Sequence, residues 1–178
     1  MKRVALVNGV PASGKSTLAR ALAAETGWPL LALDTIKEAL FAHLGAGDRE
    51  RNRMLGRASY QAIFAAIGDF PDGATAIVDA WFGFQPREVL LDHLRRADVE
   101  RVVEIWLNAS PQLVGARYAA RAAERSHGHP GIEYVPELEA LARRARPLGG
   151  FPLIEVDAER PFPADALAAE ARRRLDVG

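Results

Sequence analysis

The chain has 178 residues, 49% of them hydrophobic, which suits one globular domain with a buried core and leaves little room for a second. Its 23 basic and 23 acidic residues give a formal net charge of zero, so no overall field attracts nucleic acid or anionic lipid. There is no cysteine, which excludes disulfides, thiolate metal sites and a cysteine nucleophile.

Short β-branched segments alternate with longer helical segments along the chain. Strands are expected at residues 3–8, 30–33, 75–79, 101–107 and 151–156. Helices are expected at residues 16–26, 35–44, 52–67, 86–97, 111–125, 135–146 and 163–175. Ser110 followed by Pro111 is a typical helix start. Because strands that alternate with helices pair in parallel, the pattern predicts an α/β fold with helices on both faces of one parallel sheet.

No apolar run approaches the roughly 20 residues of a membrane span. The apolar run near the N-terminus stops at Asn8 and is shorter than the roughly 7–15 apolar residues of a secretory signal. We therefore expect a cytoplasmic protein without a membrane partner, and the oligomeric state stays open.

The segment from Gly9 to Ser16 matches the phosphate-binding pattern G-x-x-x-x-G-K-[ST] at every fixed position. In such a P-loop, backbone N–H groups and a helix N-terminus converge on phosphate oxygens. Lys15 adds a charge for the β- and γ-phosphates, and the Ser16 hydroxyl can hold Mg²⁺. A glycine-rich turn without a ligand is the alternative, but a strand ends and a helix starts where the motif requires. The residues expected to contact ATP here are Gly9, Ala12, Ser13, Gly14, Lys15, Ser16 and Thr17.

Asp79 ends the apolar strand TAIVD and is expected to bind Mg²⁺ together with Ser16. The carboxyl ends of parallel strands form the ligand-binding edge of an open α/β sheet. A capping role for this Asp is the alternative. The next residue is Ala80, where many hydrolysing P-loop ATPases have a Glu. The absence of this Glu favours phosphoryl transfer over hydrolysis.

Asp34 follows the second expected strand and should face the γ-phosphate from the same edge. A carboxylate there can accept the proton of an attacking hydroxyl or orient it. Asp is also a favoured N-cap for the helix expected from Thr35, and the two roles are compatible.

Arg117, Arg121 and Arg125 are spaced four residues apart and share one face of the expected helix. A Gly/Pro segment at residues 126–131 separates this helix from the next, so the pair is typical of a lid over about residues 111–146. Arg117 is expected to bind the nucleotide, and the other two to stabilise the transferring phosphoryl group. A solvated basic face is the alternative.

The acceptor side is expected within about residues 36–74 and just beyond Asp79. Its mixed apolar and polar side chains suit a small hydroxylated substrate. For each of these side chains taken singly, ordinary helix packing is the favoured alternative. We find no convincing basic stripe with interleaved aromatics in the sequence, so a nucleic-acid acceptor is not predicted. The side chains concerned are Phe41, His43, Arg53, Arg57, Tyr60, Gln61, Trp81, Phe82, Phe84 and Arg87.

The chain resembles small P-loop kinases of the zeta-toxin, polynucleotide-kinase and chloramphenicol-phosphotransferase type. The resemblance rests on the segments NGVPASGKSTLA, LALDTIKEAL, AIVDAWFGFQPRE and ARYAARAAERSHGHPG, which follow one another within residues 8–131. It implies a P-loop NTPase fold, three-layer α/β/α, with a five-stranded parallel sheet of order 2-3-1-4-5 and a helical lid. It also implies that Asp34 is the base or acceptor-hydroxyl ligand and that the lid arginines clamp the ATP phosphates.

These observations predict an ATP- and Mg²⁺-dependent kinase that phosphorylates a hydroxyl of a small molecule, with Lys15, Asp34, Arg121 and Arg125 as its catalytic residues. One alternative is a toxin-like nucleotide-sugar kinase or a kinase of polynucleotide ends. A further alternative is a nucleotide-dependent switch that transfers nothing. No signature of a specific acceptor is recognised.

Overall fold

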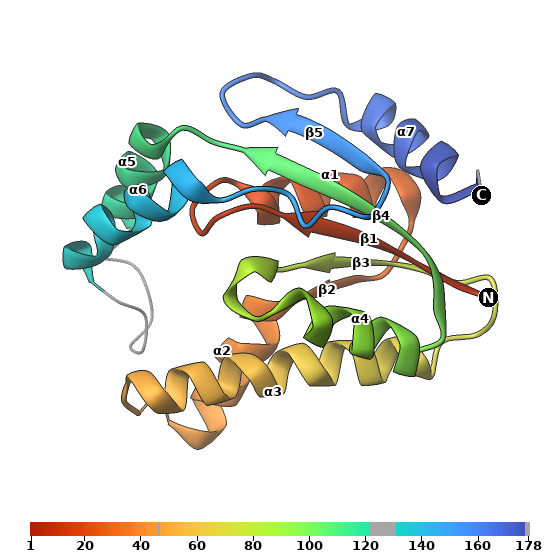
Figure 1. Ribbon diagram of the computed structural model, residues 1–178, viewed down its shortest axis with the longest axis horizontal. Helices are drawn as coiled ribbons and strands as arrows, with labels where there is room; N and C mark the ends of the chain where they lie inside the picture. Colours follow the sequence, from red (N-terminus) through yellow and green to blue (C-terminus); the bar gives the residue numbers. More distant parts are fainter. Residues whose placement is uncertain (46, 122–130, 177–178) are drawn as a thin grey trace.

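The computed structural model describes residues 1–45, 47–121 and 131–176. Within them, five strands form one parallel sheet in the order β2-β3-β1-β4-β5, as expected (Figure 1). The strands are β1 (Lys2–Asn8), β2 (Leu30–Ala32), β3 (Thr75–Asp79), β4 (Val99–Asn108) and β5 (Leu153–Asp157). The helices are α1 (Lys15–Thr26), α2 (Leu33–Leu44), α3 (Arg49–Gly68), α4 (Arg87–Arg96), α5 (Pro111–Arg121), α6 (Val135–Arg144) and α7 (Ala164–Asp176). Two short 3₁₀ helices, Phe82–Phe84 and Ile132–Tyr134, precede α4 and α6.

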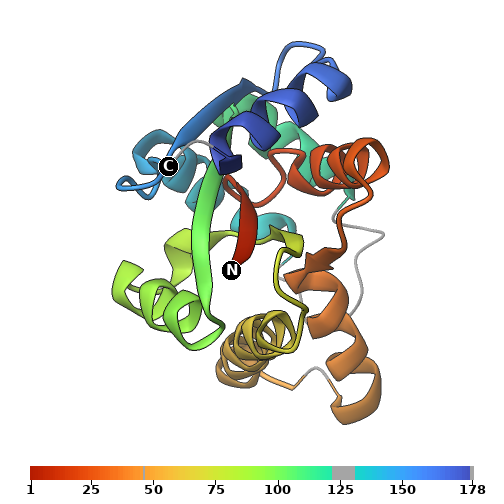
Figure 2. The same cartoon turned by 90° about the vertical axis from the view of Figure 1, so that its right-hand side faces the viewer.

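Helices cover the sheet on both faces, with α3 and α4 on one side and α1 and α7 on the other (Figures 1 and 2). Successive side chains of β1 point to opposite faces of the sheet. Val4 and Leu6 pack toward α3 and α4, whereas Ala5 and Val7 pack toward α1 and α7. The helices α5 and α6 pack together beyond the carboxyl ends of the strands (Figure 1).

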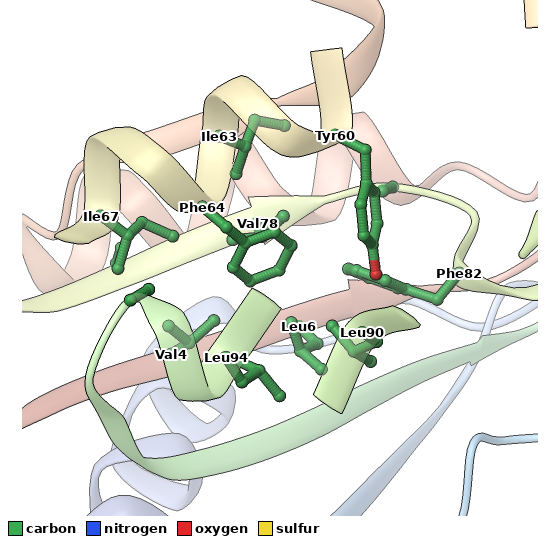
Figure 3. Close-up of a cluster of buried hydrophobic side chains, with 13 residues drawn as sticks. Val4, Leu6, Tyr60, Ile63, Phe64, Ile67, Val78, Phe82, Leu90 and Leu94 are labelled. Atoms are coloured by element: carbon green, nitrogen blue, oxygen red, sulfur yellow. The ribbon is translucent and has the colours of Figure 1, made fainter. Parts of the chain in front are cut away.

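The core under α3 contains several side chains that the sequence placed on the acceptor side. Tyr60 and Phe82 are 1% and 2% exposed and meet edge-on, with ring centroids 5.9 Å apart (Figure 3). Burial raises the pKa of the Tyr60 phenol far above its ordinary value. Phe41 is also buried. Packing, the favoured alternative, therefore explains these three aromatic residues.

Two helix starts differ by two residues or more from the sequence-based expectation. The helix α2 begins at Leu33, two residues early, with Ala32 as its N-cap, so Asp34 lies inside the first turn and the capping alternative is wrong. An acid in that turn still interacts favourably with the positive end of the helix dipole. The helix α3 begins at Arg49 because Asp48 caps it, accepting a hydrogen bond of 2.8 Å from the N–H of Arg51.

The predicted cap of α5 is confirmed. Ser110 Oγ accepts a hydrogen bond of 3.3 Å from the N–H of Leu113, and α5 starts at Pro111. The last residues of the expected helix, 122–125, lie outside the described residues. Among the helices that the structure describes, none is long and apolar enough to span a bilayer.

Candidate functional site

The P-loop motif forms the connection between β1 and α1 and has an unusual backbone. Gly9, Ala12 and Gly14 have φ angles of 149°, 66° and 108°. A Cβ at Gly9 would lie 2.8 Å from the carbonyl oxygen of Leu107, so this position requires glycine for space as well as for conformation. Gly14 is the N-cap of α1 and has no side chain to occupy the N-terminal amides of the helix, which leaves them to an anion.

Asn8, the last residue of β1, fixes the start of this loop. Its Oδ1 accepts hydrogen bonds from the N–H groups of Gly9 (2.8 Å) and Phe82 (3.2 Å), and its Nδ2 donates to Glu104 Oε1 at 2.8 Å. Glu104, on β4, is 1% exposed and also accepts a bond from the N–H of Leu148 at 2.9 Å. Burial raises the pKa of the Glu104 carboxyl, although the bonds from Asn8 and Leu148 act to lower it. The sequence prediction missed this anchor, whose signal was an acid within an otherwise apolar strand.

Asp79 lies at the carboxyl end of β3 and is 5% exposed. Burial raises the pKa of the Asp79 carboxyl; the charge of Lys15 and hydrogen bonding from the Ser16 hydroxyl act to lower it, and the charge of Asp34 acts to raise it. The structure therefore places Lys15, Ser16, Asp34 and Asp79 within one electrostatic neighbourhood.

The oxygen pair of Ser16 and Asp79 fits Mg²⁺ held partly by a nucleotide. Over the described part of the chain, no three His, Asp or Glu side chains converge on one point. The oxygens of Ser16 and Asp79 are too few for a cation that is coordinated by protein ligands alone. Mg²⁺ fits it, because this ion commonly takes one or two protein oxygens and completes its octahedron with phosphates and water.

Lys15 and Arg117 both donate to carbonyl groups of the loop. Lys15 Nζ donates to the carbonyl of Val10 at 3.1 Å. Arg117 Nη1 donates to the carbonyl of Ser13 at 2.6 Å, and its Nη2 to that of Ala158 at 3.3 Å. Arg117 therefore joins α5, the P-loop and the connection after β5.

The other predicted lid arginines differ in what the structure describes of them. Arg121 is exposed, lines the same cleft as the P-loop, and donates through Nε to the carbonyl of Arg117 at 3.3 Å. Arg125 lies outside the described residues. Ser13 is fully buried, and its hydroxyl has no hydrogen-bond partner within the described residues.

One cleft of about 1510 Å³ joins the two halves of the candidate site. Its donor wall is the P-loop and the start of α1, and its opposite wall is formed by α2 and the first half of α3. The predicted site residues that line it are Ala12, Gly14, Lys15, Ser16, Thr17, Asp34, Asp79 and Arg121. Gly9, Ser13 and Arg117 lie behind this lining and shape the loop.

The cleft contains only some of the residues that the sequence suggested for the acceptor side. Arg53, Arg57, Trp81 and Phe84 line the cleft. Arg87 instead stacks over the ring of Phe151, 5.3 Å from its centroid. His43 and Gln61 are exposed and do not line the cleft. Sequence reasoning missed the cleft-lining residues Arg20, Arg49, Asn52, Gly56, Tyr118, Glu133, Tyr134 and Glu137.

A family model described as AAA domain matches residues 4–145, most of the chain. The chain belongs to this family. With the parallel sheet and the loop geometry, this match confirms the α/β P-loop NTPase fold. No curated protein matches the chain.

Solved structures with the same fold include proteins named as kinases. A protein from Chloroflexus aurantiacus that is provisionally named a kinase is 29% identical, with a TM-score of 0.79 and 98% of both chains covered. A gluconokinase from Sinorhizobium meliloti is 18% identical, with a TM-score of 0.58, 98% of this chain and 91% of the other covered. A sugar kinase from a Janibacter species is 20% identical, with a TM-score of 0.57 and 99% and 94% covered. These matches do not single out the zeta-toxin, polynucleotide-kinase and chloramphenicol-phosphotransferase group, so that narrower resemblance stays a prediction.

Proposed function

We propose that the protein is a kinase that uses ATP and Mg²⁺ to phosphorylate a hydroxyl group of a small molecule. The observation that carries this proposal is the cleft shared by two sets of residues: the phosphate-binding set of Lys15 and Ser16 with Asp79, and Asp34 on the facing helix α2. A binder or a switch has no need of a second carboxylate at this position. The names of the structural neighbours agree with a phosphotransferase.

The reaction forms a bond between the acceptor oxygen and the γ-phosphorus and breaks the bond from that phosphorus to ADP. Asp34 accepts the proton that the acceptor hydroxyl loses. Lys15 and the amides at the start of α1 balance the charge on the phosphoryl oxygens. Ser16 and Asp79 would hold Mg²⁺, which would supply positive charge to neutralise the phosphate oxygens.

The residue after Asp79 supports transfer rather than hydrolysis. Ala80 is 3% exposed and carries no group that could polarise a water molecule.

We also assign the lid function to α5 and α6, within a single domain of residues 1–178. Arg121 and Arg125 then stabilise the phosphoryl group. An acceptor segment at about residues 36–74 completes this assignment.

The test is a screen of metabolites, sugars and antibiotics, incubated with ATP and Mg²⁺ and analysed by mass spectrometry for the gain of one phosphoryl group. With the acceptor found, Asp34→Asn should keep ATP affinity and lose at least about 100-fold in kcat, the lower range for general-base catalysis. Transfer by this variant at the wild-type rate would remove Asp34 from the mechanism. Equal ATP consumption with and without every compound would support a switch instead.

A further inference from the structure

The first half of α3 presents a basic stripe to the cleft. The cleft-lining residues Arg49, Asn52, Arg53, Gly56 and Arg57 follow the 3–4 spacing of one helix face. The stripe contains three arginines and no acid. The other face of α3 packs into the core through Leu55, Ser59, Tyr60, Ile63, Phe64 and Ile67. Because core packing buries one face of α3, the opposite face lines the cleft.

Two of the three arginines on this stripe have no ion-pair partner among the residues that the structure describes. Arg49 pairs with Glu137 at 3.5 Å. Within residues 1–45, 47–121 and 131–176, Arg53 and Arg57 form neither an ion pair nor a hydrogen bond, although Asp34 and Glu38 line the same cleft. Like charges four residues apart on a helix repel one another, so this pair is unfavourable until an anion joins it.

Gly56 lies on the stripe between these two arginines. A glycine within a helix is less stable than alanine at the same position. Packing does not require it, because a Cβ at Gly56 would meet no described atom within 4 Å. Gly56 is buried at the floor of the cleft, and its missing side chain leaves space between the two arginines.

We infer that the phosphoryl acceptor carries an anionic group, a carboxylate or a phosphate, which binds to Arg53 and Arg57 over Gly56. Both oxyanions match the planar donor geometry of guanidinium groups. The acceptor hydroxyl then lies toward Asp34 on the neighbouring helix, in the same cleft. This inference rests on the proposed kinase function and narrows its substrate class to polyhydroxy acids and phosphate monoesters.

The test compares acceptors that share a carbon skeleton and differ in charge. Gluconate is paired with sorbitol, glucose 6-phosphate with glucose, and the panel extends to the corresponding five-carbon and three-carbon compounds. With ATP and Mg²⁺, the anionic members should be phosphorylated with a kcat/KM at least about 10-fold above their neutral partners, since one charged hydrogen bond is worth that much. The carboxylate and phosphate arms show which of the two anions the site prefers.

Substitutions on α3 locate the anion. Arg53→Gln and Arg57→Gln should each raise the KM of the anionic acceptor about 10- to 100-fold, which is a larger change than in the KM of any neutral partner. Arg95→Gln is the matched control, because Arg95 is an exposed helix arginine that pairs with Asp92 and does not line the cleft. Gly56→Ala should raise the melting temperature through its better helix propensity and still raise the KM of the anionic acceptor.

Binding measurements separate this inference from the kinase proposal. The P-loop is filled with a non-hydrolysable ATP analogue and Mg²⁺, and the same panel is titrated by calorimetry. Anion binding that Arg57→Gln weakens, without transfer in the kinase assay, upholds the anion site and removes the kinase function. Equal transfer to neutral and anionic partners, unaffected by the arginine substitutions, upholds the kinase and overturns the anion site. A panel in which no anionic member binds or reacts overturns the anion site, and the kinase proposal then depends on whether the neutral members are phosphorylated.

Discussion

The guanidinium of Arg117 donates a hydrogen bond of 2.6 Å to the backbone carbonyl of Ser13, which joins α5 to the P-loop across 104 positions of sequence. Its second nitrogen reaches the carbonyl of Ala158 at 3.3 Å. A single side chain thus connects the phosphate-binding loop, the helix α5 and the segment after β5. Its contacts in this structure indicate that Arg117 positions the loop, while direct contact with the nucleotide stays a prediction.

Replacing Arg117 with Lys should weaken ATP binding about 10-fold, because an ammonium group can reach one of the two carbonyls but cannot bridge both. The dissociation constant of a fluorescent ATP analogue measures this. Arg95→Lys is the control: Arg95 is exposed, pairs with Asp92 on α4 and does not line the cleft, so ATP affinity should hold. Wild-type affinity in the Arg117→Lys protein would mean that the bridge to Ser13 and Ala158 does not shape the loop.

Gly9→Ala should destabilise the protein and abolish nucleotide binding. The new Cβ would lie 2.8 Å from the carbonyl oxygen of Leu107, and the φ of 149° is unfavourable for alanine. Strain of this kind costs about 1–3 kcal/mol, measurable by urea unfolding. Gly27→Ala is the matched control: its φ is 71° and no described atom lies within 4 Å of its Cβ, so it should cost about 1–2 kcal/mol and leave nucleotide affinity intact. Equal nucleotide affinities for the two variants would contradict the steric argument.

The sequence predicted the order of the elements well because local patterns determine them. The strand Thr75–Asp79 was predicted to the residue, since an apolar run there follows a turn and ends in an acid. The strand β4 begins at Val99, two residues before the expected start, because pairing with β1 extends it through polar residues. The register of β1 against β4 shifts between Lys2 and Arg3, which single-strand patterns do not reveal.

The site was predictable where one motif carries the chemistry and not where distant segments meet. Lys15 and Ser16 belong to a contiguous motif, and Asp79 ends a recognisable strand. The link from Asn8 to Glu104 spans 96 positions and exists only once β1 and β4 are adjacent. The basic stripe of α3 could have been noticed from the spacing of its arginines, but which face meets the cleft depends on the packing of Tyr60 and its neighbours.

Asp79→Asn should weaken Mg²⁺ binding in the nucleotide complex about 10-fold or more, because it removes the charge that faces the cation while keeping a similar shape. Titration of Mg²⁺ at saturating ATP analogue measures the effect, and affinity for the analogue without Mg²⁺ should change little. Ser16→Ala should shift the same titration in the same direction. Unchanged Mg²⁺ affinity in both variants would show that neither oxygen is a ligand.

Glu104 is expected to make stability depend on pH. Because burial raises its pKa above the ordinary value of 4.5, the folded state keeps this proton at pH values where the unfolded chain has released it. The stability contribution is therefore full below pH 4.5 and is lost as pH rises through the raised pKa. Glu104→Gln cannot titrate, so its free energy of unfolding in urea, measured from pH 4.5 to 8, should fall less steeply than that of the wild type. Glu100→Gln is the matched control on the same strand, because that side chain is exposed. Parallel curves for wild type and Glu104→Gln would show that burial does not shift this carboxyl.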